Sequence, residues 1–364
     1  MQQSMLFVNG VNTSFGGSGA ESMRTWKKSF QGANIQYDYF HTVPNLGLPR
    51  GNIRYLIFLV IYFLPGSIFR FFKFPLFEFF YKLSVINVFL FYRVVCRGDF
   101  FKVVFSHHSS FYLSLIVPYF KRVFLIHDLM YVRVRSMGGS AMLQRICLNI
   151  ELRIYRRAPH LLVLSYHEMR VLKKFLNNNI SLIRCCDLDN VGYFTQKNHN
   201  YAVISDWRRS ENIHGISQFL LKSNSDCSLA RNFHLRIYGF GSNDLISRLT
   251  AQGVIQRLNI TNGGIFNEMS EVNEMSVLVP IYHGAGIKRK TLEAIVNGRM
   301  VFGTKEAFIG IPRRLISKVS KVVTSMNDLG PICMRPSNEV FIKTLSDLRS
   351  IFLDISKALE SDRI

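Results

Sequence analysis

The residues best suited to chemistry in this sequence lie between positions 280 and 304. Two glycines, Gly284 and Gly286, follow an apolar run at 277–281 and precede a segment with helical apolar spacing. A glycine-rich turn between a strand and a helix aims free backbone N–H groups and the positive end of the helix dipole at one point, which favours an anion. Three consecutive cations, residues 288–290, fall in the predicted first turn, where they are unfavourable for the helix itself. A bound anion explains these cations; the alternative is a solvated charge run on an ordinary helix.

The composition also indicates an anionic partner. The 364-residue chain carries 45 Lys and Arg against 24 Asp and Glu, a formal charge of +21. Nucleic acid, an anionic membrane surface and a phosphorylated substrate all fit this excess. The 31 Phe residues favour the membrane, because a soluble nucleic-acid binder seldom uses so much Phe. We therefore expect an anionic membrane surface and no nucleic acid as partner.

One stretch combines aromatic and basic residues most densely. Residues 55–69 carry no charge, but a spanning helix needs about 20 apolar residues, so we predict no transmembrane helix there. Next in the chain, Arg70 and Lys73 enclose Phe71 and Phe72. Basic residues among aromatic ones suit a helix that lies in the headgroup layer of an anionic membrane. We predict that these residues bind the membrane; burial in a large α/β domain is the alternative.

The location follows from the cysteines and the N-terminus. The six cysteines are scattered without a CxxC pair, and the N-terminus has no basic region followed by an apolar core. Reduced thiols and the lack of a signal peptide indicate the cytoplasm. With the predicted membrane contact, we expect a peripheral protein on the inner face of the plasma membrane.

Strand-like and helix-like segments alternate along both halves of the chain. The predicted strands are residues 5–9, 35–40, 103–105, 123–126, 161–164, 201–204, 233–238, 258–261, 277–281, 300–304 and 321–324. This alternation predicts an α/β fold of two Rossmann-like parallel domains that face a central cleft. We place an N-terminal domain at 1–198, a C-terminal domain at 199–337 and a C-terminal helix at 338–364 that packs back toward the N-terminal domain.

The first half offers two further candidates. Gly16 and Gly17 follow the first predicted strand, but they do not form GxGxxG, so the dinucleotide fingerprint is absent. His127 ends a predicted strand, at the edge where α/β sheets bind ligands; a core histidine is the alternative. The neighbouring pair His107 and His108 is interpreted as structural.

With these pieces in place, the second half resembles the donor-binding domain of GT-B glycosyltransferases, most closely the retaining glycosyltransferase family 4. The family's Val-Pro and Gly-x-Gly-x-Lys-x-Lys-x-x-Glu-Ala block is matched at 279–294, its Trp-x-x-Asn-like segment at 205–212 and its Gly-x-Gly turn at 238–241. The resemblance covers most of residues 5–330. The chain departs from the pattern at Ala285, where many members carry a second acidic residue.

The resemblance implies a nucleotide-diphosphate sugar donor and assigns roles to residues of this chain. Glu293 would accept hydrogen bonds from the ribose hydroxyls, although as the alternative it is an exposed helix carboxylate paired with Lys290. Cations would neutralise the departing diphosphate, as in other electrostatic stabilisation of developing charge. The implied catalytic residues are His127, Arg208 and Lys288, and the implied donor-binding residues are Gly16, Gly17, Arg209, Gly239, Gly241, Gly284, Gly286, Ile287 and Glu293.

The sequence and the resemblance together predict a hexosyl- or related glycosyltransferase. It would move a sugar from the nucleotide donor to a lipid-linked or polysaccharide acceptor, in bacterial synthesis of O-antigen, capsule or lipopolysaccharide. Retention at the anomeric carbon and independence of metals and other cofactors follow from the resemblance alone. A non-catalytic basic membrane- or nucleic-acid-binding protein explains the charge but not the ordered Gly, Lys and Glu block. A nucleotide-dependent oxidoreductase lacks its GxGxxG fingerprint.

Overall fold

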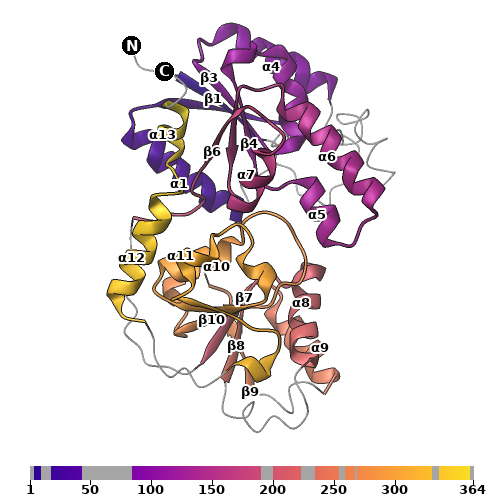
Figure 1. The fold of residues 1–364 in the computed structure, drawn as a ribbon, viewed down its shortest axis with the longest axis vertical. Helices are drawn as coiled ribbons and strands as arrows, with labels where there is room; N and C mark the ends of the chain where they lie inside the picture. The colour runs from indigo at the N-terminus through magenta and orange to yellow at the C-terminus, as the bar shows by residue number, and fades with distance from the viewer. Residues whose placement is uncertain are drawn as a thin grey trace. The chain divides into compact units, whose positions relative to one another are not determined.

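The structure is a computed structural model that forms two compact units. It describes residues 4–9, 18–42, 84–189, 200–222, 234–253, 259–266, 269–329 and 336–360. The first unit consists of Met1–Cys185 and Phe352–Ile364, and the second of Cys186–Ile351. In each unit, helices connect the strands of a parallel sheet (Figure 1).

The first unit contains a six-stranded parallel sheet in the order β2-β1-β3-β4-β5-β6. Its strands are β1 (Ser4–Asn9), β2 (Gln36–His41), β3 (Lys102–Ser106), β4 (Arg122–Ile126), β5 (His160–Val163) and β6 (Asn179–Leu182). Its helices are α1 (Ser18–Gly32), α4 (Val85–Arg97), η2 (His108–Ile116), η3 (Tyr119–Lys121), α5 (Met130–Ser136), α6 (Ala141–Tyr155), α7 (Tyr166–Leu172) and α13 (Ile355–Glu360). The middle strands are continuous apolar runs because helices cover both faces of such a sheet; residues 123–126 are all buried.

The second unit repeats this plan with the strand order β12-β11-β10-β7-β8-β9. Its strands are β7 (Tyr201–Ile204), β8 (His234–Tyr238), β9 (Asn259–Gly264), β10 (Ser276–Val279), β11 (Met300–Gly303) and β12 (Ser320–Val322). Its helices are α8 (Ser210–Leu221), α9 (Ser242–Ala251), η6 (Met269–Glu271), α10 (Arg289–Val296), η7 (Lys305–Phe308), α11 (Arg313–Ile316), η8 (Met326–Asp328) and α12 (Asn338–Arg349). The chain starts at β7 and builds outward on both sides, so the strand order reverses between β7 and β10.

The predicted α/β class is confirmed, while the C-terminal region differs from the prediction. The single helix predicted at 338–364 is two helices, because α12 ends at its C-cap Ser350 and the chain then becomes extended. The Leu353 N–H donates to the Leu182 carbonyl (2.8 Å) and the Leu353 carbonyl accepts from the Arg184 N–H (3.0 Å). Only α13 therefore packs in the first unit, beside α1 (Figure 1).

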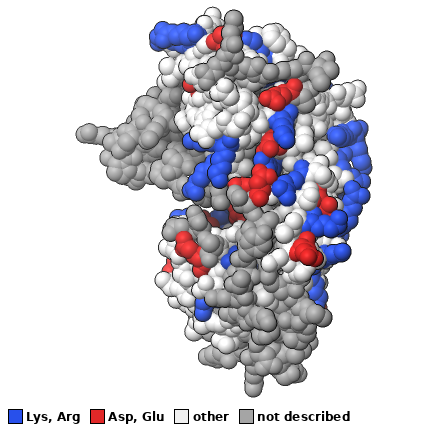
Figure 2. All heavy atoms as spheres, turned by 90° about the vertical axis from the view of Figure 1, so that its left-hand side faces the viewer, with Lys and Arg blue, Asp and Glu red and all other residues white. Residues whose placement is uncertain are grey.

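The units divide after residues 185 and 351, whereas the sequence predicts boundaries after 198 and 337. The candidate linker at 195–200 lies almost wholly outside the described residues. Within the described ranges, no helix is both long and apolar enough to cross a membrane. On the face shown in Figure 2, Lys and Arg cover more of the described surface than Asp and Glu, as the composition leads one to expect.

Candidate functional site

The candidate residues of the second unit gather where its strand order reverses. Strands β7 and β10 are parallel neighbours, with Val203 opposite Leu278. The loop after β7 carries residues 205–209, and the loop after β10 carries residues 280–288. Both loops leave the sheet at its carboxyl edge, the usual ligand position in open α/β sheets. The fold thus brings together two segments that are about 75 residues apart in the sequence.

The loop after β10 has the geometry of an anion-binding turn. Gly284 and Gly286 adopt positive φ angles of 133° and 70°, which suit glycine. Lys288 is the N-cap residue of α10 and its side chain makes no capping hydrogen bond. Instead, Lys288 Nζ donates to the Ala285 carbonyl at 2.7 Å, folding back over the turn. The N-cap residue therefore gives α10 no side-chain cap and places a cation beside its first turn, an arrangement that suits an anion.

Arg208 is held in position at the end of the loop after β7. Its guanidinium donates to both carboxylate oxygens of Asp206, at 2.7 and 2.8 Å, and lies 4.8 Å from the centre of the Phe240 ring. These hydrogen bonds lower the pKa of Asp206, so the carboxylate stays charged. Arg209 instead forms an ion pair with Glu211. The side chain of Arg208 remains 66% exposed and accessible to a ligand.

Two glycines bring the loops after β7 and β8 together. Gly239 has φ 118°, and a Cβ there would lie 1.9 Å from the Ser205 carbonyl oxygen. Gly241 has φ 79° and is the N-cap of α9. Trp207 fastens the same junction, since its indole N–H donates to the Tyr238 carbonyl at 2.8 Å. The predicted Gly-x-Gly turn is therefore a close backbone contact that fixes the position of Arg208.

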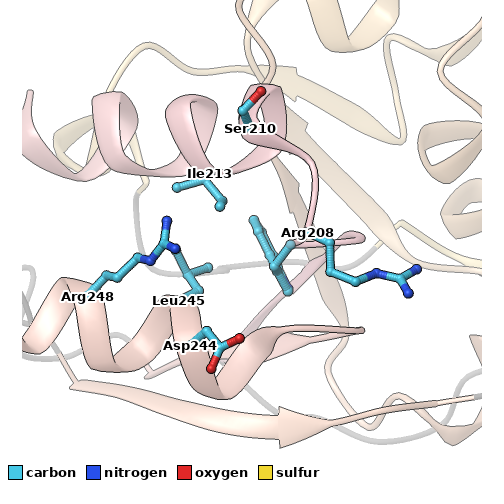
Figure 3. Close-up of a pocket in the computed structure, with 7 residues that line it drawn as sticks. Arg208, Ser210, Ile213, Asp244, Leu245 and Arg248 are labelled. Carbon is cyan, nitrogen blue, oxygen red and sulfur yellow. The ribbon is translucent and has the colours of Figure 1, made fainter. Parts of the chain in front are cut away.

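A pocket of about 230 Å³ lies next to this junction, between α8 and α9. Its lining residues are Trp207, Arg208, Ser210, Ile213, Asp244, Leu245 and Arg248. Figure 3 shows that the guanidinium of Arg208 extends away from the other lining residues. Of the predicted site residues that the structure describes, only Arg208 lines this pocket, so the pocket is separate from the glycine turn after β10.

Glu293 lies on α10 and pairs with Arg289, one helical turn earlier. The alternative interpretation, an exposed carboxylate paired with Lys290, is wrong: the partner is Arg289, and the carboxylate is only partly exposed. The Glu293 side chain is 22% exposed and that of Arg289 10%. Its carboxylate is fixed on the same helix whose N-terminus carries the glycine turn.

Lys290 has a role that the sequence did not indicate. Its Nζ donates to Ser205 Oγ at 2.5 Å and approaches the Ile204 carbonyl at 3.4 Å, which ties α10 to the end of β7. Burial lowers its pKa to about 7, and the charges of Lys288 and Arg209 act in the same direction. The partly buried amine of Lys290 thus joins the two loops of the site.

The low pKa of Lys290 predicts a pH-dependent stability. A lysine in an unfolded chain has a pKa of about 10.4, so between about pH 7 and that value the unfolded chain binds more protons. Stability that depends on Lys290 must therefore rise with pH across this window. We expect the melting temperature of the wild type to gain on that of Lys290→Met between pH 6.5 and pH 9. Parallel curves in differential scanning calorimetry would show that Lys290 does not titrate there.

In the first unit, His127 follows β4 at the carboxyl edge of the sheet. One ring nitrogen, Nε2, lies 2.9 Å from Ser106 Oγ, and the ring meets Trp26 edge-on at 6.2 Å. Burial lowers the pKa of His127 to about 4, against the opposing effect of Asp128. His127 is therefore neutral at physiological pH and suited to hydrogen bonding rather than to acting as a cation.

His107 belongs to the same cluster, although the sequence predicts only a structural role for it. It has a positive φ of 75°, which is unusual for a residue with a side chain. Its ring lies 3.8 Å from that of His108 and 6.2 Å from that of His127. His107 Nδ1 lies 2.9 Å from Ser109 Oγ. The carboxyl ends of β3 and β4 thus present imidazoles and hydroxyls side by side.

Two buried glutamates hold the chain that follows His127. Glu151 accepts hydrogen bonds from the backbone N–H groups of Met130 (2.7 Å) and Tyr131 (2.9 Å). Glu168 accepts one from the Leu129 N–H at 3.0 Å. Burial raises the pKa of Glu151 to about 7 in spite of these bonds. Both residues cap the start of α5 and thereby fix the segment next to His127.

The remaining predicted site residues lie outside the described residues. These are Gly16, Gly17, Arg70, Phe71, Phe72 and Lys73. In the ranges that are described, no three His, Cys, Asp or Glu side chains gather in a way that could hold a metal ion.

Solved structures similar to this chain over nearly its whole length include glycosyltransferases. TarM, known from S. aureus, has a TM-score of 0.63 at 11% identity, with 99% of this chain and 98% of that chain covered. WaaB, the lipopolysaccharide outer core galactosyltransferase, has a TM-score of 0.58 at 12% identity and 99% coverage of both chains. The chain has the GT-B fold. HepE from Anabaena, in complex with UDP and glucose, is a further GT-B neighbour, with a TM-score of 0.56, 12% identity and coverage of 98% and 97%.

No protein-family model matches the sequence, and no curated protein matches it either. The similarity to GT-B structures, by contrast, extends over nearly the whole chain. The candidate site rests on the geometry of this chain's own residues.

Proposed function

We propose that this protein is a glycosyltransferase that takes a sugar from a nucleotide-diphosphate donor. The observation that carries the proposal is the turn at Gly284 and Gly286, which leads into an α10 N-terminus with no side-chain cap and with Lys288 beside it. A diphosphate fits this arrangement, because backbone N–H groups and the helix dipole favour phosphate oxygens. Among the GT-B neighbours, HepE has been solved with UDP-glucose and TarM with UDP, which supports a nucleotide ligand.

The second unit also supplies the positive charges that the reaction needs. As the bond between the sugar and the diphosphate breaks, negative charge develops on the departing oxygen. Lys288 lies over the glycine turn and Asp206 holds Arg208 at the end of the loop after β7, so both can stabilise that charge. We assign the ribose hydroxyls to Glu293, Arg209 and Ile287 to the phosphate surroundings, and the transferred sugar to neutral His127. Metal independence and retention at the anomeric carbon remain predictions from the family resemblance.

The acceptor side of the proposal is a lipid-linked or polysaccharide saccharide at the cytoplasmic face of the plasma membrane. The formal charge of +21 and the basic and aromatic residues 70–73 support attachment to anionic lipid. One GT-B neighbour, WaaB, is a lipopolysaccharide outer core galactosyltransferase, which agrees with a surface polysaccharide pathway. The product would then be an extended glycolipid or polysaccharide.

Calorimetric titration with UDP, GDP and dTDP tests the donor site. We expect at least one of them to bind the wild type, and Glu293→Ala to weaken that binding about tenfold to a hundredfold, since hydrogen bonds to a charged group are lost. Glu339→Ala, which removes an exposed glutamate from the first turn of α12, is the matched control and should bind as the wild type does. If no nucleotide binds the wild type, the proposed function is wrong. If a nucleotide binds Glu293→Ala as tightly as it binds the wild type, only the role assigned to Glu293 is wrong.

A further inference from the structure

Helix α4 presents large apolar side chains to solvent. Val85 is 73% exposed, Phe89 59% and Tyr92 55%, and Ile86 and Leu90 are 45% and 41% exposed. Scattered exposed apolar residues are normal, but five of them on one 13-residue helix form a patch of the kind that marks an interaction site.

The opposite face of α4 determines which side chains point outward. Phe91 is fully buried and its ring lies 5.1 Å from that of Phe40. Asn87 is also fully buried and donates through Nδ2 to the Thr42 carbonyl at 2.9 Å. The helix cannot turn its apolar face inward without exposing Phe91 and breaking the hydrogen bond of a buried amide. The exposed patch is therefore a stable feature of this unit.

The charges of α4 specify the kind of partner. The sequence 85–97 contains Arg93 and Arg97 and no acidic residue. The Arg93 guanidinium lies 5.9 Å from the centre of the Phe89 ring, so apolar and cationic groups share one surface. An apolar face bordered by cations matches a bilayer that contains anionic lipid. A second copy of this chain is a poorer match, because it would bring the same arginines together in a protein of formal charge +21.

The position of α4 relates this patch to the candidate site of the same unit. The bond from Asn87 to the Thr42 carbonyl places the first turn of α4 next to the residue that follows β2. Thr42 lies at the carboxyl edge of the sheet, the edge that also carries His107 and His127. A membrane surface against this end of α4 would be on the same side of the unit as His107 and His127.

We propose that α4 is a membrane-docking helix that inserts Val85, Ile86, Phe89 and Leu90 into the headgroup region of an anionic bilayer. The inference deepens the proposed function and rests on it for the identity of the acceptor. It assigns membrane contact to residues other than Arg70 and Lys73. Docking through α4 would bring a lipid-linked acceptor to the carboxyl edge of the first sheet.

Sedimentation with lipid vesicles tests this inference on the full chain. The double variant Phe89→Glu/Leu90→Glu should bind vesicles of phosphatidylglycerol and phosphatidylcholine at least about tenfold more weakly than the wild type, because two charges must enter the apolar boundary. Arg93→Gln/Arg97→Gln should bind vesicles that contain phosphatidylglycerol about fivefold more weakly for each removed charge. Its affinity for vesicles without phosphatidylglycerol should equal that of the wild type. Met142→Glu is the matched control, because Met142 is 74% exposed on α6 of the same unit; it should bind as the wild type does.

Two outcomes would overturn the docking proposal. The first is vesicle binding of Phe89→Glu/Leu90→Glu equal to that of the wild type. The second is a wild type that ignores vesicles but self-associates in ultracentrifugation, with the variant monomeric, which would make this face an interface between copies. Donor hydrolysis in solution, measured on the same proteins, separates this proposal from the proposed function. The rate of donor hydrolysis should be equal in the wild type and in Phe89→Glu/Leu90→Glu. If neither protein hydrolyses a donor while the wild type still binds vesicles, only the transferase activity is refuted.

Discussion

Replacing Lys288 with Met is expected to lower kcat for sugar transfer by about 10²- to 10³-fold, the loss typical when a preorganised group that stabilises developing charge is removed. Lys288 occupies the N-cap position of α10, and its Nζ donates to the Ala285 carbonyl at 2.7 Å, over the glycine turn. The diphosphate gains charge as the sugar leaves, so a cation at this point is worth more in the transition state than in the bound donor. The loss should therefore appear mainly in kcat and less in KM.

Lys318→Met provides the matched control for this prediction. Lys318 is an exposed lysine of the same unit, in the turn between α11 and β12, so its replacement removes the same charge from the unit without touching the glycine turn. Steady-state kinetics with the preferred donor should leave this control near the wild type. Equal kcat values for Lys288→Met and Lys318→Met would remove Lys288 from the reaction.

Replacing Gly239 with Ala is expected to destabilise the second unit by about 3 kcal/mol or more, which places it among the severe single substitutions. The new Cβ would lie 1.9 Å from the Ser205 carbonyl oxygen, and backbone atoms cannot move aside as a flexible side chain can. The φ of 118° adds strain for any L-residue. Because Ser205 begins the loop that positions Arg208, donor affinity should fall together with stability.

Gly253→Ala separates the backbone clash from the strain of a positive φ. Gly253 has φ 68°, and no atom lies within 4 Å of the place that an added methyl group would take. This variant should therefore lose only about 1–2 kcal/mol, the cost of a left-handed residue. Differential scanning calorimetry of both variants gives the comparison. If the two substitutions lower the melting temperature equally, the close approach of Gly239 to Ser205 has no energetic weight.

A strand could be predicted from the sequence where a local run of apolar residues determines it. The run Tyr201–Ile204 is wholly buried and bounded by polar residues, so its strand could be predicted to the residue. β6 could not, because Asn179–Leu182 alternates polar and apolar residues over only four positions and becomes a strand through pairing with β5. The end of α12 was also missed, since the extended pairing of Leu353 with Leu182 depends on a partner 171 residues away.

The same distinction applies to the site. The glycine turn and the cations after β10 are adjacent in sequence, so their common position at the start of α10 could be predicted. Which of three consecutive cations points inward depends on the position of β7, and the structure shows that Lys290 reaches Ser205. The partnership of Asp206 with Arg208 and that of Ser106 with His127 likewise depend on side-chain geometry that no pattern encodes.

The release of nucleotide from a panel of UDP-, GDP- and dTDP-sugars tests the central claim most directly. The purified wild-type chain is incubated with each donor, with and without membrane lipid extract as acceptor source, beside the Lys288→Met variant. We predict that one donor is turned over, that the extract accelerates it, and that Lys288→Met abolishes most of the turnover. If the wild type and Lys288→Met release nucleotide from every donor only at the rate of the protein-free blank, this chain is not a glycosyltransferase.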